Sequence, residues 1–96
     1  MSEKSNIVYI GRKPIMSYVL AVMTHLNSSN AQDVIIKARG RAITTAVDVA
    51  EVTRRRFINN ISVDTIAIGT EEMKQEDGST RSVSTMEIKL TLPKKA

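Results

Sequence analysis

The sequence predicts one compact α/β (α+β) domain with the element order β-α-β-α-β-β. Two observations lead to this prediction. Short β-branched apolar runs alternate with two stretches of helical periodicity, and two longer strand-like runs follow each other near the end. Such alternation gives a sheet with helices packed across it, and a terminal hairpin adds antiparallel pairing. We therefore expect a four-stranded mixed sheet with two helices packed on it.

A short strand and a long helix are expected in the first third of the chain. Residues 7–10 are apolar and β-branched, and Gly11 closes the run, which is typical of a buried strand. The helix is expected to begin at Pro14, because the missing N–H of proline costs nothing in a first helical turn. Its apolar stripe is Ile15, Val19, Val22 and Leu26, widened by Met16, Leu20 and Met23, so much of its circumference should be buried.

The second strand and second helix meet at a basic junction. Residues 33–39 alternate, so Val34, Ile36 and Ala38 can face a core while Lys37 and Arg39 point outward together. Gly40 permits the sharp backbone that a strand-to-helix junction needs. A helix with apolar spacing is then expected from residue 41 or 42 to residue 58.

The last two strands are expected at residues 61–72 and 82–92. Asp77-Gly78 lies between them and favours a tight hairpin turn, because glycine, and to a lesser degree aspartate, accepts a positive φ. Residues 71–82 would then project as a hairpin arm. This arm carries Lys74 and Arg81 among four acids, namely Glu71, Glu72, Glu76 and Asp77.

The chain length fits a single domain over residues 1–96, with flexible ends expected at 1–6 and 93–96. A chain this short buries a small fraction of its surface, so a second copy that completes the core would stabilise it. Its aromatic residues are only Tyr9, Tyr18 and Phe57. This scarcity argues against a platform that stacks unpaired bases.

Positive charge is concentrated in the first part of the chain. Residues 1–60 hold nine Lys/Arg against four acids, and residues 61–96 hold five against six. A localised basic field favours a polyanion such as nucleic acid over an anionic membrane surface. The sequence has no cysteine and one histidine, and no apolar run approaches the ~20 residues of a membrane span. We expect a soluble cytoplasmic protein without metal or cofactor.

Three cations surround the predicted junction between the second strand and the second helix. Lys37, Arg39 and Arg41 would converge with the positive end of a helix dipole, which suits a phosphate. Spacing alone is equally compatible with a charged loop in water. For the arginine run at 54–56, capping of the helix end is favoured over binding.

The chain resembles the Alba family of archaeal chromatin proteins. The resemblance rests on a basic loop that ends in proline, a Lys-Ala-Arg-Gly-Arg-Ala-Ile run and several shorter matches, at residues 10–14, 16, 18–20, 36–43, 46–48, 77–78 and 83–85. It implies an archaeal homodimer that coats and condenses double-stranded DNA with little sequence preference, is associated with the chromosome, and also binds RNA.

The resemblance also implies roles for individual residues. Arg12 and Lys13 would contact the duplex, with Lys37, Arg39 and Arg41 on the same surface. Lys74 and Arg81 on the arm would reach along the minor groove. Phe57 would join dimers along DNA, although burial in its own core is equally compatible with its position. The family's acetylated lysine aligns with Arg12, which acetylation cannot neutralise, so Lys13 is the candidate for acetylation.

Three alternatives remain open at this point. The chain could be a dedicated RNA-binding protein, either a subunit of a ribonuclease P-type particle or an RNA chaperone. It could be a metal-assisted nuclease that uses Asp48 and Glu51, three residues apart on one helix face, although a solvated face is favoured. It could also be an assembly module built around Phe57. We expect no catalytic residue.

Overall fold

The computed structural model describes residues 6–28 and 32–93. The predicted order of elements is confirmed, with an additional π-helical turn, η1, after the second helix. The elements are β1 (Ile7–Tyr9), α1 (Ile15–Ser28), β2 (Asp33–Arg39), α2 (Ala42–Val52), η1 (Thr53–Phe57), β3 (Ser62–Lys74) and β4 (Thr80–Thr91). The ends expected to be flexible lie outside the described residues, except for Asn6 and Pro93.

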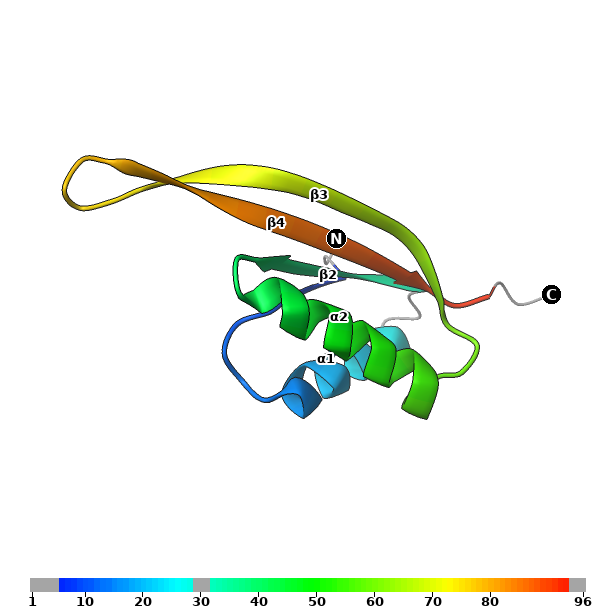
Figure 1. Ribbon diagram of the computed structural model, residues 1–96. Coiled ribbons are helices and arrows are strands. Elements are labelled where there is room, and N and C mark those ends of the chain that lie inside the picture. The colour runs from blue at the N-terminus through cyan, green and yellow to red at the C-terminus, as the bar shows by residue number, and fades with distance from the viewer. Residues whose placement is uncertain (1–5, 29–31, 94–96) are drawn as a thin grey trace.

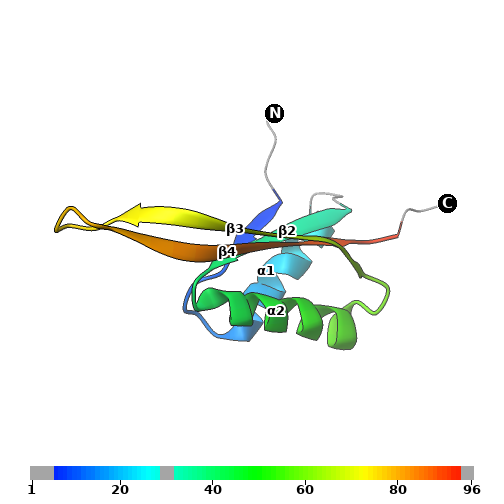
Figure 2. The same cartoon turned by 45° about the horizontal axis from the view of Figure 1, so that its top comes forward.

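The four strands form one mixed sheet in the order β1-β2-β4-β3. β1 pairs with β2 in parallel, whereas β4 is antiparallel to both β2 and β3. Both helices lie on the same face of this sheet (Figure 1), and the turned view in Figure 2 shows them beneath it. The opposite face therefore has no layer of secondary structure on it among the described residues.

The core lies between the two helices and strands β1, β2 and β4. The predicted alternation along β2 is confirmed, because Val34, Ile36 and Ala38 are buried. These side chains pack in one cluster with Val19 and Val22 of α1, and with residues of α2 and β4. The stripe on α1 is narrower than expected, since Met16 and Leu20 are exposed.

The second helix does not run as a uniform α-helix to residue 58. It changes to η1 at Thr53, and the N–H of Ile58 donates to the carbonyl of Thr53 at 2.8 Å. The Thr53 hydroxyl is buried and donates to the carbonyl of Val49 at 2.8 Å, which offers the backbone an alternative hydrogen bond and disturbs the helix locally. None of the described helices is long and apolar enough to cross a membrane.

The β3–β4 hairpin extends well past the helices (Figure 1) and differs in detail from the prediction. β3 continues to Lys74 and β4 begins at Thr80, so both strands reach further into the arm than expected. Asp77-Gly78 is not a two-residue turn. The Gly78 N–H donates to the carbonyl of Gln75, and Gly78 has a φ of 93°, as in a three-residue hairpin loop with glycine in its left-handed position.

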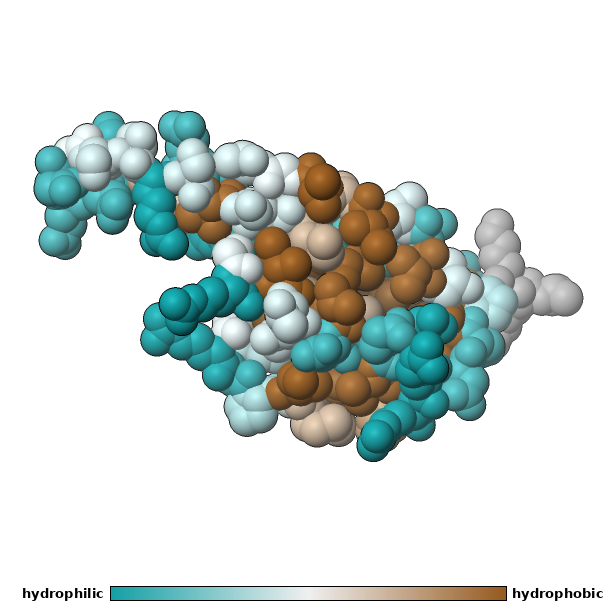
Figure 3. Space-filling view, viewed as in Figure 1, coloured by the Kyte–Doolittle hydropathy of each residue, from teal (hydrophilic) through white to brown (hydrophobic). Residues whose placement is uncertain are grey.

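One side of β3 is apolar and uncovered. Ile66 pairs with the buried Ile88, and Ile68 pairs with Met86, so both isoleucines point to the face that carries the helices. α2 packs against β2 and β4, which leaves Ile68 77% exposed and Ile66 56% exposed. Hydrophobic side chains gather across β3, β4 and α2 in Figure 3.

Candidate nucleic-acid interface

Two basic loops lie at one end of the sheet. Because β1 and β2 are parallel, the loop after β1 and the junction after β2 leave the sheet at the same end. The hairpin arm projects from this end too (Figure 1). Arg12, Lys13 and Arg41, which we call the loop cations, are exposed there, and no carboxylate within residues 6–28 and 32–93 forms an ion pair with them. They are available to an anion.

A buried tyrosine hydroxyl holds the first of these loops. The N–H groups of Gly11 and Lys13 both donate to the hydroxyl oxygen of Tyr18, at 2.8 and 2.9 Å. Tyr18 belongs to α1 and its ring is in the core, so it fixes the loop backbone on either side of Arg12. The sequence reasoning missed this role, although the five-residue spacing from Lys13 to a tyrosine in the following helix was a usable signal.

A glycine makes the second junction possible, as the sequence predicts. Gly40 has a φ of 59°, and its N–H donates to the carbonyl of Ser84 at 2.8 Å. This ties the end of β2 to the base of the arm. Arg41 then occupies the N-cap position of α2. The first free N–H groups of that helix therefore follow directly after Arg41, and the helix dipole favours a negative ligand there.

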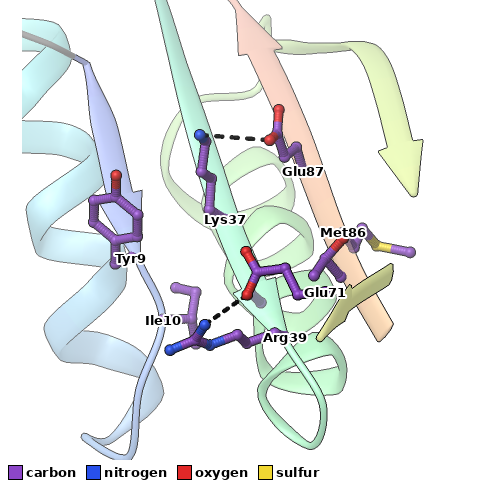
Figure 4. Close-up of a pocket in the computed structure, with 9 residues that line it drawn as sticks. Tyr9, Ile10, Lys37, Arg39, Glu71, Met86 and Glu87 are labelled. Carbon is purple, nitrogen blue, oxygen red and sulfur yellow. Dashed lines mark hydrogen bonds and ion pairs between the residues drawn. The ribbon is translucent and has the colours of Figure 1, made fainter. Parts of the chain in front are cut away.

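Lys37 and Arg39, the sheet-face cations, lie in a different environment. Both side chains lie on the open face of the sheet and each is paired with a carboxylate (Figure 4): Lys37 with Glu87 of the neighbouring strand β4, and Arg39 with Glu71 of β3, across β4. Lys37 Nζ is 3.4 Å from Glu87 Oε2, and Arg39 Nη1 donates to Glu71 Oε1 at 2.7 Å. The predicted set of five cations thus divides into three loop cations and two paired ones.

The arm carries its cations on exposed positions near its end. Lys74 closes β3, and Arg81 lies on β4 opposite Met73. The loop between them is acidic, and Asp77 is stabilised as a carboxylate: hydrogen bonds from the Ser79 hydroxyl and backbone N–H lower the pKa of Asp77. The charge of the arm is therefore mixed rather than uniformly basic.

The remaining candidates lie in η1, directly after α2. Phe57 is 45% exposed at the end of η1 and is not part of the core cluster. Two of the three arginines at 54–56 pair with Glu51, since Arg54 Nε and Arg55 Nε each donate to its carboxylate at 2.7 Å. Hydrogen bonds from Arg55 and then Arg54 hold the pKa of Glu51 below its ordinary value.

The alternative metal site at Asp48 and Glu51 gains no third ligand from this geometry. Within the described part of the chain, no group of three or more His, Cys, Asp or Glu side chains is placed to hold a metal ion. The carboxylate of Glu51 is already engaged by two guanidinium groups. His25 lies half-buried on α1.

Comparison with known proteins assigns the chain to a family. The family model of Alba matches residues 6–70. A DNA/RNA-binding protein Alba from Methanococcus maripaludis is 53% identical over 86% of this chain and 93% of its own length. One from Methanocella arvoryzae is 48% identical over 97% of this chain and 96% of its own length. The solved structure of Alba from Thermoplasma volcanium has a TM-score of 0.83 at 49% identity, and covers 90% of this chain and 99% of its own. The chain belongs to the Alba family.

Proposed function

We propose that this protein binds nucleic acid through phosphate contacts and coats double-stranded DNA as a homodimer, while also binding RNA. The observation that carries the proposal is the cluster of three exposed loop cations at the end of the sheet from which the arm projects. The names of its relatives, DNA/RNA-binding protein Alba, support the same conclusion. We propose a binding role without catalysis, on the chromosome in the cytoplasm.

Phosphate contacts contribute to affinity but give little sequence specificity. Lysine and arginine side chains from loops reach phosphate oxygens, which are the same at every base pair. α2 offers no row of Asn, Gln or Arg side chains for base edges, because its sequence is Ala-Ile-Thr-Thr-Ala-Val-Asp-Val-Ala-Glu-Val. Binding is therefore expected to be strongly salt-dependent and nearly independent of sequence.

We propose that a second copy of the chain covers the exposed apolar side of β3, on the face of the sheet that carries the helices. Ile66 and Ile68 of β3 and Val47 of α2 are exposed on the helix side of the sheet. Large exposed apolar patches mark interaction sites, and a patch that pairs with its own copy gives a twofold dimer. Such pairing would double the loop cations to match the two charged strands of a duplex.

The remaining candidate residues have roles in this proposal beyond the contacts of the dimer body. The two arms would extend along the duplex and place Lys74 and Arg81 beside its groove, with the acidic tips limiting deep insertion. Phe57 is exposed at the opposite end of α2, where it would join neighbouring dimers. Acetylation of Lys13 would remove one of the loop cations and weaken phosphate binding.

A salt titration tests the proposal directly. Binding to DNA and RNA duplexes of equal length is measured by fluorescence anisotropy over a range of salt concentrations. If about five cations of a dimer contact phosphates, the slope of log K against log salt is roughly −4 to −5. A flat response would contradict the electrostatic account. A preference for RNA of ten-fold or more would favour the dedicated RNA-binding alternative instead.

Sedimentation analysis tests the dimer independently of nucleic acid. The wild type is expected to sediment as a dimer, and Ile68→Glu as a monomer, because a buried unpaired carboxylate opposes association. Leu20→Glu is the matched control, since Leu20 is also exposed and apolar but lies on α1. A monomeric wild type, a dimer that survives Ile68→Glu, or a dimer that is lost in Leu20→Glu would contradict the proposed interface.

A further inference from the structure

A hollow of about 390 Å³ lies on the open face of the sheet, and none of the loop cations lines it. Tyr9, Lys37 and Glu87 form one row across it, because Tyr9 is opposite Lys37 on the neighbouring strand and Lys37 is opposite Glu87 on the next. Arg39 and Glu71 border the same space (Figure 4). Its volume is within the range of small-molecule sites.

The charges of this hollow cancel. Two cations and two carboxylates border it, and they are joined as the ion pairs Lys37–Glu87 and Arg39–Glu71. A phosphodiester gains little from a neutral site, because each cation is already engaged by a carboxylate. A nucleobase is neutral and carries both hydrogen-bond donors and acceptors, so it fits this environment better than a phosphate does.

An exposed aromatic ring adds a stacking surface at the edge of this hollow. Tyr9 is 70% exposed on the open face, beside the charged side chain of Lys37. Protein sites for unpaired nucleotides combine cations with aromatic rings on which the bases stack. The low aromatic content of the chain argued against such a site, but the fold places one of its three aromatic residues where a single base could use it.

Two residues that line the hollow are close in sequence to the loop cations. Ile10 lines the hollow and is followed by the loop that contains Arg12, while Arg39 is two residues from Arg41. A nucleic-acid strand whose phosphates contact the loop cations can therefore place a neighbouring nucleotide in the hollow. A paired base cannot do so, because its edges and faces are occupied within the duplex.

We propose that this hollow binds one unpaired base of a bound nucleic acid, stacked on the ring of Tyr9. Each bordering carboxylate holds its cation through one oxygen atom, Glu87 through Oε2 and Glu71 through Oε1. The second oxygen of either carboxylate accepts an N–H of the base. This inference rests on the proposed nucleic-acid binding and adds to it a preference for duplexes with a bulged nucleotide.

The test compares an RNA duplex with one bulged 2-aminopurine nucleotide to the same duplex without the bulge. The wild type is expected to bind the bulged duplex about five-fold or more tightly, and stacking is expected to quench the 2-aminopurine fluorescence. Tyr9→Leu removes the ring and should lose both the preference and the quenching, with binding to the perfect duplex unchanged. Tyr9→Phe should retain both.

Leu20→Ala serves as the matched control, because Leu20 is a similarly exposed large side chain on α1. Circular dichroism melting checks that each variant is folded. Equal binding of both duplexes by the wild type, or a preference that persists in Tyr9→Leu, would overturn this inference and leave the proposed function intact. Failure of the wild type to bind either duplex would overturn both.

Discussion

The loop cations and the sheet-face cations carry the same formal charge in different surroundings. Arg12, Lys13 and Arg41 project from loops at one end of the sheet. The sheet-face cations stand on β2, where the adjacent strand β4 brings Glu87 within 3.4 Å of Lys37, and where Arg39 reaches across β4 to Glu71 of β3 at 2.7 Å. The difference teaches that a count of basic residues overestimates the phosphate-binding surface, because cross-strand neighbours can neutralise a cation that a loop leaves available.

Removing two loop cations should have the largest effect. In Arg12→Ala/Lys13→Ala, a dimer loses four cations, so affinity for duplex DNA at low salt is expected to fall by about 100-fold or more. Fluorescence anisotropy measures this loss. Arg55→Ala/Arg56→Ala is the control, because it also removes two exposed cations per chain, from η1 at the opposite end of the second helical segment. Equal losses in both would show that net charge, not position, decides binding.

Releasing the first loop from its anchor should have a smaller effect. Tyr18→Phe keeps the ring in the core but removes the acceptor for the N–H groups of Gly11 and Lys13. The loop cations would then lose their fixed position, and duplex affinity is expected to fall by about three- to ten-fold, since ordering a mobile side chain on binding costs roughly 0.5–1.5 kcal/mol.

Hydrogen exchange provides an independent measurement on Tyr18→Phe. The amides of Gly11 and Lys13 are expected to exchange faster than in the wild type, because both lose their hydrogen-bond acceptor. Unchanged exchange together with unchanged affinity would show that the hydroxyl of Tyr18 does not position the loop.

Freeing a sheet-face cation from its ion pair should raise the affinity for a duplex. Glu71→Gln removes the charge that holds Arg39, so affinity for a perfect duplex is expected to rise by about two- to five-fold, in line with the modest strength of exposed ion pairs. Glu72→Gln removes the same charge from the adjacent residue, which forms no ion pair with a described cation. A rise of equal size in both variants would mean that only the charge of the arm matters.

The fold was predictable because its signals are local. Apolar periodicity located α1 and α2, and the alternation of Val34, Ile36 and Ala38 correctly oriented β2. Arg41 was identified as a candidate by its position between a strand and a helix, and Arg12 and Lys13 by the resemblance to the Alba family. Gly40 was also predictable, since its positive φ is a local requirement of the junction.

The rest depended on contacts between distant residues. Glu71 is 32 residues from Arg39 and meets it only because β4 lies between β2 and β3, so that the side chains of Arg39 and Glu71 can meet across it. The burial of Thr53 and the exposure of Phe57, both in η1, depend on where the core ends. The hollow beside Tyr9 requires the register of all four strands. Periodicity along a single element contains none of this information.

Changing Phe57 should affect single-dimer binding least, because it belongs to neither group of cations. Phe57→Ala is expected to leave affinity for a short duplex within about two-fold, since the residue is 45% exposed and outside the core cluster. Cooperative coating of long DNA, followed by electron microscopy, should weaken. Loss of folding, seen by circular dichroism, would instead show that Phe57 supports the core.

The most direct measurement compares the salt dependence of two double variants on the same DNA duplex. Arg12→Ala/Lys13→Ala is expected to make the slope of log K against log salt shallower by about 3 to 4, because a dimer loses four phosphate contacts. Lys37→Ala/Arg39→Ala removes the same charge but is expected to change the slope by about 1 or less. Equal changes, or a larger change in the second variant, would contradict the division between loop cations and sheet-face cations.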